Sequence, residues 1–170
     1  MPLSLQFDPA VWVKAAARDA KSDFALKGEF VVSEHQGRNW GLLTVPNSVV
    51  RGLFDAMDDP ELELPPSGAG GRLKAHISVI RPEEFEKAQL SLLDKMRGKR
   101  FSYQLGPIKT VNPKGWDDMN AVWFVAIKSP ELSKLRTQAG LTPLPVSKRT
   151  EMPFHLTVAV RRKKNRPKES

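Results

Sequence analysis

Two short stretches, Ala75-His76-Ile77-Ser78-Val79 and Phe154-His155-Leu156-Thr157-Val158, share one order of side chains: apolar, histidine, apolar, hydroxyl, apolar. Polar and apolar residues alternate with period 2 in both, and β-favouring residues are frequent, which predicts two β-strands. Because residues i and i+2 of a strand share a face, each histidine should lie beside the hydroxyl residue that follows it. The chain has only three histidines, so two in matching strands are more informative than one.

A strand that presents an imidazole and a hydroxyl on one face carries groups suited to phosphate chemistry. An imidazole exchanges a proton near neutral pH, and a hydroxyl donates a hydrogen bond to an anionic oxygen. If the two strands face each other across a phosphate, one histidine can act as base and the other as acid, which predicts a bell-shaped pH profile. A single motif of this kind is usually structural. Coincidence therefore stays an alternative, in which the chain is an α+β domain of another function.

Helix and strand signals alternate around the two motifs, and each half of the chain runs from a helix through a loop into a motif strand. This suggests a weak internal duplication. Asp8-Pro9 and Ser129-Pro130 are typical helix starts, and proline- and glycine-rich segments indicate loops at 61–71, 112–118 and 141–150. The expected strands are 28–33, 40–46, 73–80, 101–111, 121–127 and 153–160, and the expected helices are 8–21, 48–57, 82–97 and 130–139.

The paired motifs His76-Ile77-Ser78 and His155-Leu156-Thr157, with the order of elements from about residue 40 to 160, resemble the two-histidine (2H) phosphoesterase superfamily. The resemblance implies a bilobal α+β fold, in which two pseudo-symmetric lobes of antiparallel sheet, with helices outside, enclose a central cleft. It implies His155 as base and His76 as acid in opening a 2',3'-cyclic phosphate, with Ser78 and Thr157 holding phosphate oxygens. No metal or other cofactor is required by this scheme. Ser78 replaces the commoner threonine and keeps the hydroxyl.

Composition is that of a soluble globular protein, with 40% hydrophobic and 27% charged residues in 170 residues. No apolar run suits a membrane span, no signal peptide is evident, and cysteine is absent, so we expect a cytoplasmic protein without disulfides or thiolate metal sites. We also expect a monomer. We expect an N-terminal helix-strand addition at 1–38, a single domain at 39–160 and a basic, disordered tail at 161–170. The tail supplies much of the net charge of +8, which indicates either contact with nucleic acid or a solvated end.

Basic and aromatic residues near the motifs are candidates for substrate contacts. Trp40 is more readily interpreted as core, and His35, in a polar turn without a hydroxyl two positions on, as an exposed residue. The candidate substrate-binding residues are Lys74, Arg81, Lys148 and Arg149 for phosphate and Tyr103 and Trp116 for base stacking.

The sequence therefore predicts a metal-independent phosphodiesterase that acts on nucleotides or RNA. Two alternatives stay open. One is a hydrolase of cyclic or 2'-5'-linked oligonucleotide messengers, and the other is a catalytically inactive RNA-binding module that relies on the basic tail.

Overall fold

The structure, a computed structural model, describes residues 26–65, 75–112, 119–147 and 149–163. The helix expected at 8–21, most of the loop at 61–71 and the loop residues 113–118 lie outside these ranges. The described helices are α2 (Asn47–Met57), α3 (Pro82–Phe85), α4 (Leu90–Met96) and α5 (Pro130–Gln138). The described strands are β1 (Leu26–His35), β2 (Arg38–Thr44), β3 (His76–Ile80), β4 (Arg100–Val111), β5 (Met119–Lys128), β6 (Val146–Ser147), β7 (Thr150–Glu151) and β8 (Phe154–Arg162).

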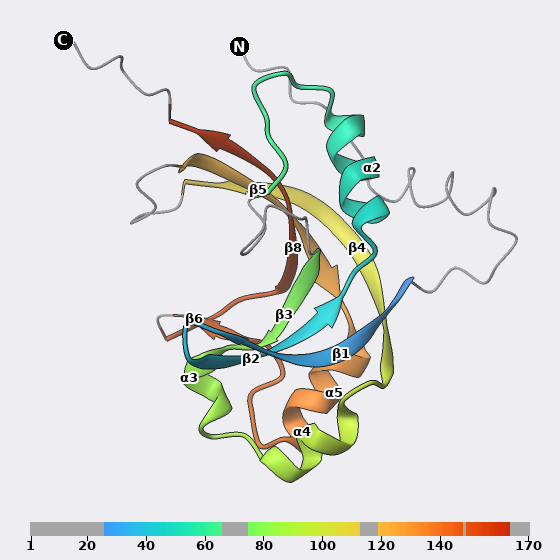
Figure 1. The fold of residues 1–170 in the computed structure, drawn as a ribbon, viewed down its shortest axis with the longest axis vertical. Helices are drawn as coiled ribbons and strands as arrows, with labels where there is room; N and C mark the ends of the chain where they lie inside the picture. Colours follow the sequence, from blue (N-terminus) through green and yellow to red (C-terminus); the bar gives the residue numbers. More distant parts are fainter. Residues whose placement is uncertain (1–25, 66–74, 113–118, 148, 164–170) are drawn as a thin grey trace, which may run out of the picture.

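Six strands form one large antiparallel sheet in the order β3-β2-β1-β4-β5-β8, and β6 pairs with β7 in a small hairpin. The sheet curves strongly, so that its two edge strands, β3 and β8, lie against each other (Figure 1). In the view of Figure 1, α3, α4 and α5 gather at one end of the molecule and α2 lies at the other. The fold is thus a mixed α/β fold built on an antiparallel sheet.

Strand β1 lies inside the sheet and is hydrogen-bonded on both sides. It pairs with β2 along Phe30–His35 and with β4 along Leu26–Glu29. The expected boundary at residue 38 therefore runs through the β1–β2 hairpin, and the described part of the expected N-terminal addition belongs to the main sheet. The pattern of residues 28–33 indicated a strand correctly, but its partners are long-range and leave no local signal.

One hydrophobic core spans both halves of the chain. Leu43, Ile77 and Val79 from the first half belong to the same buried cluster as Val125 and Leu156 from the second. This shared core does not divide the described residues into two lobes. The expected pseudo-symmetry of two lobes therefore stays a prediction.

The helix expected at 82–97 is divided into α3 and α4. The backbone N–H of Gln89 donates to the carbonyl oxygen of Ala139 at the end of α5 (3.0 Å), so the helical hydrogen-bond ladder stops there. The segment between α3 and α4 thus contacts the end of α5. This contact connects the second half of the chain to the residues that follow β3.

Candidate active site

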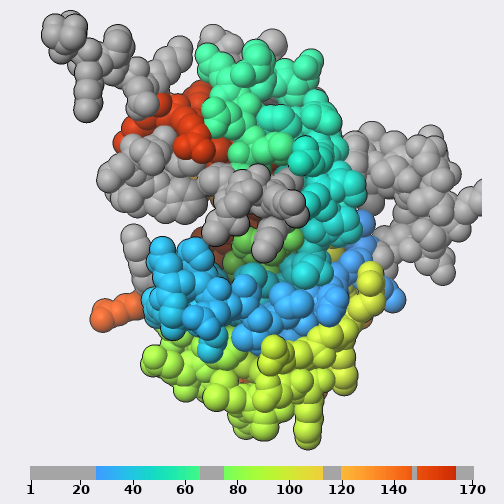
Figure 2. Space-filling model, in the orientation of Figure 1, coloured from blue at the N-terminus to red at the C-terminus, as the bar shows by residue number. Residues whose placement is uncertain are grey.

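The two motif strands are the two edges of the sheet, and the curvature brings them together. Figure 2 shows β3 and β8 between α2 on one side and the β1–β2 hairpin on the other. On β3, Ile77 and Val79 are completely buried, whereas His76 is exposed and Ser78 is partly exposed. The period-2 expectation for this strand is confirmed.

Strand β8 has the same alternation. Phe154 and Leu156 are buried in the core, whereas His155 and Thr157 are partly exposed on the opposite face. The neighbouring strand β5 places Ala126 opposite His155 and Phe124 opposite Thr157. The rings of Phe124 and His155 meet edge to face, with centroids 5.3 Å apart and an angle of 62° between the ring planes.

Electrostatics link His155 to the first motif. Burial lowers the pKa of His155 below its ordinary value, a hydrogen bond to the backbone at Pro153 opposes this shift, and the charges of Arg81 and His76 lower the pKa further. Such interactions require the three side chains to lie near one another. The Nδ1 atom of His155 is 3.4 Å from the carbonyl oxygen of Pro153, and a proton on Nδ1 leaves Nε2 able to accept another proton.

Backbone contacts fix the start of the first motif strand. The N–H of Ala75 donates to Oδ1 of Asn47 (3.0 Å), and the carbonyl oxygen of Ala75 accepts from the N–H of Val45 (3.0 Å). Asn47 is the first residue of α2, and its side chain binds the residue before His76. The link between α2 and β3 thus helps to orient the first histidine.

A buried arginine fixes the other end of β3. Arg136 of α5 is completely buried, and its Nη1 donates to the carbonyl oxygen of Val79 (2.7 Å). Arg136 also pairs with Glu84 of α3 (2.6 Å). A helix of the second half therefore holds the strand that carries the first motif.

The structure distributes the candidate substrate-binding residues unevenly. Arg81 follows β3 directly, near His155, and its guanidinium lies over the ring of Trp40 at 5.9 Å from the ring centroid. Arg149 is exposed in the turn between β6 and β7. Lys74, Trp116 and Lys148 lie outside the described residues.

Tyr103 requires a correction. Its side chain is only 2% exposed and belongs to the hydrophobic core, so it is not accessible for stacking on a base. On β4 the neighbouring Leu105 lies opposite the buried Ile127, and Tyr103, two residues earlier, points to the same inner face. Tyr103 was expected to stack on a base, but strand alternation turns its side chain into the core.

Two residues near the motifs were missed by sequence reasoning. Phe124 contacts His155, and Lys109 of β4 lies directly opposite Phe124. Both positions follow from strand register across the irregularity between Leu105 and Ile108, and register is not visible in either segment alone.

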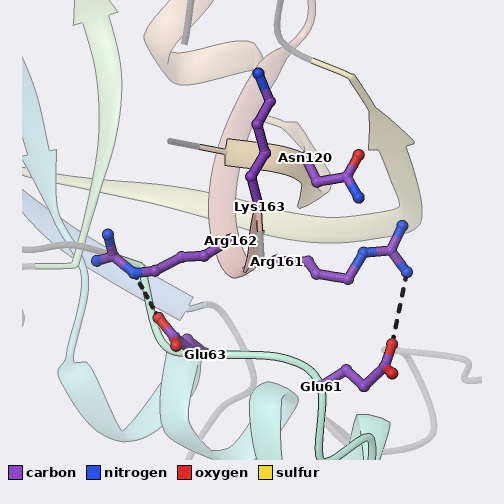
Figure 3. Close-up of a pocket in the computed structure, with 6 residues that line it drawn as sticks. All are labelled: Glu61, Glu63, Asn120, Arg161, Arg162 and Lys163. Carbon is purple, nitrogen blue, oxygen red and sulfur yellow. Dashed lines mark hydrogen bonds and ion pairs between the residues drawn. The ribbon is translucent and has the colours of Figure 1, made fainter. Parts of the chain in front are cut away.

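A cavity lies at the far end of β8, away from the histidines. It measures about 830 Å³ and is lined by Glu61, Glu63, Asn120, Arg161, Arg162 and Lys163 (Figure 3). Its charges are largely paired, with 2.6 Å between Arg162 Nε and Glu63 Oε2 and 3.9 Å between Arg161 and Glu61. Glu63 also exchanges two backbone hydrogen bonds with Val160. These contacts fasten the segment after α2 to the free edge of β8.

In the described parts of the chain, no three histidine, cysteine, aspartate or glutamate side chains are grouped as metal ligands. None of the described helices has the length and apolar character needed to cross a membrane.

Comparison with known proteins identifies the family. No curated protein and no solved structure matches the chain. The family model for 2H-SAK, described as Swiss Army Knife, 2H phosphoesterase domain, matches residues 51–165, which include both motif strands and most of the sheet. With two His-x-Ser/Thr strands side by side at the edges of one sheet, and this match over most of its length, the chain belongs to the 2H-SAK family of 2H phosphoesterase domains.

Proposed function

We propose that this protein hydrolyses phosphodiesters of nucleotides or RNA, most simply by opening a 2',3'-cyclic phosphate. The observation that carries the proposal is that His76 with Ser78 and His155 with Thr157 lie on adjacent edge strands, with the apolar neighbours of each pair buried in the core. Membership of a 2H phosphoesterase family supports phosphodiester hydrolysis as the general reaction. The specific substrate is our proposal.

We assign the base to His155. Its lowered pKa keeps the imidazole neutral at pH 7, as a base must be before it takes a proton. The carbonyl of Pro153, 3.4 Å from Nδ1, favours the tautomer in which Nε2 is the accepting atom. In the proposed step, Nε2 takes a proton from water as the water oxygen forms a bond to phosphorus.

We assign the acid to His76. It is the more exposed of the two histidines and lies on the facing strand. As one P–O bond of the cyclic ester breaks, His76 donates a proton to the leaving ribose oxygen, so the product is a phosphomonoester with a free hydroxyl. The proton taken up by His155 balances the proton given by His76, and both return to their starting states through solvent.

In the proposed mechanism, the hydroxyls of Ser78 and Thr157 donate hydrogen bonds to the non-bridging oxygens of the phosphate. Negative charge on these oxygens grows as phosphorus becomes five-coordinate, and a fixed donor stabilises that charge more than it stabilises the ground state. Arg81, beside His155, supplies positive charge at the same place. We also propose Lys74, Lys148 and Arg149 as phosphate contacts and Trp116 as a base contact.

The test is hydrolysis of a panel of 2',3'-cyclic nucleotides, 2'-5' and 3'-5' oligoadenylates and cyclic dinucleotides in the presence of EDTA. We expect turnover of cyclic phosphates, and a fall in kcat of about 10²–10⁴-fold for His76→Ala and for His155→Ala. Ser78→Ala and Thr157→Val should each lower kcat by about 10²–10³-fold. His35→Ala is the matched control, because His35 is the third histidine and lies exposed at the end of β1.

The alternatives give different results. Turnover of only the oligoadenylates or cyclic dinucleotides would identify a hydrolase of oligonucleotide messengers. An absence of turnover from a folded protein that binds RNA, with affinity unchanged in both histidine variants, would contradict the enzymatic proposal and favour an RNA-binding module.

A further inference from the structure

A row of three side chains extends from the second motif across the sheet. The register pairs Thr157 of β8 with Phe124 of β5, and Phe124 with Lys109 of β4. Side chains directly opposite each other on neighbouring strands point to the same face. Lys109 therefore shares the face that carries Thr157 and His155.

The row sets the distance of the lysine from the motif. Neighbouring strands lie about 4.8 Å apart, so two strand steps separate the backbones of Lys109 and Thr157 by roughly 10 Å. The long, flexible side chain of Lys109 can extend over part of this separation towards Thr157, or away from it. Its ammonium group can therefore contact a phosphate that is one nucleotide away from a phosphate held by Thr157.

The environment of Lys109 leaves its charge available to a ligand. Lys109 is exposed, and among the residues that the structure describes no carboxylate forms an ion pair with it. By contrast, Arg161 and Arg162 at the far end of β8 are both paired with glutamates (Figure 3). Lys109 thus offers a positive charge on the face of the proposed active site, whereas these two arginines already pair with glutamates.

Phe124 lies between the lysine and the motif. Its ring is partly exposed and meets the imidazole of His155 edge to face at 5.3 Å. Partly exposed apolar surface at this position suits the sugar or base that connects two phosphates, because neither needs a charged partner. The sequence of contacts along the row is then hydroxyl, apolar ring and cation.

We propose that Lys109 and Phe124 form a subsite for a second phosphate, and that the substrate carries such a phosphate one nucleotide step from the bond that is cleaved. This inference rests on the proposed function and narrows its substrate class. The second phosphate belongs either to the 5' position of a nucleoside 2',3'-cyclic phosphate or to the preceding linkage of an oligonucleotide that ends in a cyclic phosphate.

Three substrates separate these cases: adenosine 2',3'-cyclic phosphate, the same compound with a 5'-phosphate, and the dinucleotide ApA ending in a 2',3'-cyclic phosphate. We expect Lys109→Ala to raise KM about 10-fold for substrates that have the second phosphate, with kcat little changed, because one charge-assisted contact is lost. The simple cyclic nucleotide should be unaffected. Lys109→Arg should restore most of the loss. Lys95→Ala, at an exposed lysine of α4, is the matched control.

The two sources of the phosphate are told apart by which compound responds. A response with the dinucleotide alone assigns the subsite to an oligonucleotide linkage, and a response with the 5'-phosphate alone assigns it to a mononucleotide. Equal effects of Lys109→Ala on all three substrates, or no effect on any, would overturn the subsite.

Failure of the proposed function gives a different result. If none of the three is hydrolysed, their binding to the unmodified protein and to Lys109→Ala is measured at several salt concentrations. A subsite predicts that Lys109→Ala binds only the two compounds with a second phosphate more weakly, with the logarithmic salt slope reduced by about 1. Unchanged binding would reject the subsite independently of catalysis.

Discussion

Arg136 and Glu84 form a buried, two-pronged ion pair that connects the segments next to both motif strands. Nη1 of Arg136 lies 2.9 Å from Oε2 of Glu84, and Nη2 lies 2.6 Å from Oε1. Arg136 also donates to the backbone carbonyls of Val79, Thr142 and Leu144. Glu84 accepts from the backbone N–H groups of Arg81 and Val146. The end of the first motif strand and the approach to the second are therefore held by the same pair.

Removing one member of this pair should strongly destabilise the fold. Arg136→Met and Glu84→Leu should each lower the free energy of unfolding by about 3–5 kcal/mol, because the remaining charge is left buried without its partner. The double variant should cost less than the sum of the two single changes. Urea unfolding of the four proteins measures the coupling.

The exposed pair of Arg38 and Glu83 is the matched control. These atoms are 3.4 Å apart, but both side chains are more than half exposed. Arg38→Ala should therefore change the free energy of unfolding by about 1 kcal/mol or less. Equal losses for Arg38→Ala and Arg136→Met would contradict the importance of the buried pair.

Stability should also depend on pH through Glu84. Burial alone would raise the pKa of this carboxyl, but hydrogen bonds from the side chain of Arg136 and from the N–H groups of Arg81 and Val146, together with the charge of Arg136, hold it below 4.5. A carboxyl with a lowered pKa in the folded state stabilises the protein above the unfolded value and loses this contribution as pH falls through the folded value. We expect Tm to decrease below about pH 4.5, and the decrease should be shallower in Glu84→Gln. Parallel curves for the two proteins would exclude Glu84 as the cause.

The local pattern of the sequence predicted the motif strands because strand alternation needs only neighbouring residues. His76 with Ser78 and His155 with Thr157 share faces as expected, with buried residues between them. Arg136 could not be predicted in this way. Its partners at Val79 and Glu84 are more than fifty positions away in the chain, and arginine at the end of a helix is ordinarily a solvated residue.

Register explains the other differences between prediction and structure. Lys109 and Phe124 reach the face of the motif only through pairings of β4, β5 and β8, and irregularities interrupt both ladders. Tyr103 was misinterpreted because the same strand sends alternate residues to opposite faces, and no local feature says which face is inner. The place of β1 in the middle of the sheet is likewise a long-range property.

The buried position of Tyr103 can be measured directly, because it is the only tyrosine in the chain. Burial raises the pKa of Tyr103 to about 12. We expect the phenolate absorbance of the folded protein to appear near this pH, and near pH 10 once the chain is unfolded in denaturant. Because the neutral form is favoured only in the folded state, this group should also lower stability as pH rises from 10 towards 12. A midpoint near pH 10 in the folded protein would place the phenol in water.

The acidic limb of the pH–rate profile should report His155. As the proposed base, His155 must be neutral, so kcat/KM falls when the pH drops through its pKa in the free enzyme. Burial first, and then the charges of Arg81 and His76, lower this pKa, so the midpoint should lie below the ordinary value of 6.5. Arg81→Gln removes one positive charge and should move the limb to higher pH, towards 6.5.

The direction of this shift separates a role near His155 from a general loss of substrate binding. A lost phosphate contact alone would lower kcat/KM at every pH and leave the midpoint where it was. Arg51→Gln, on the exposed side of α2, should change neither the level nor the midpoint. A limb that stays in place in Arg81→Gln would show that the charge of Arg81 does not act on the base, and the assignment of His155 as base would then rest on its burial and its contact with Pro153 alone.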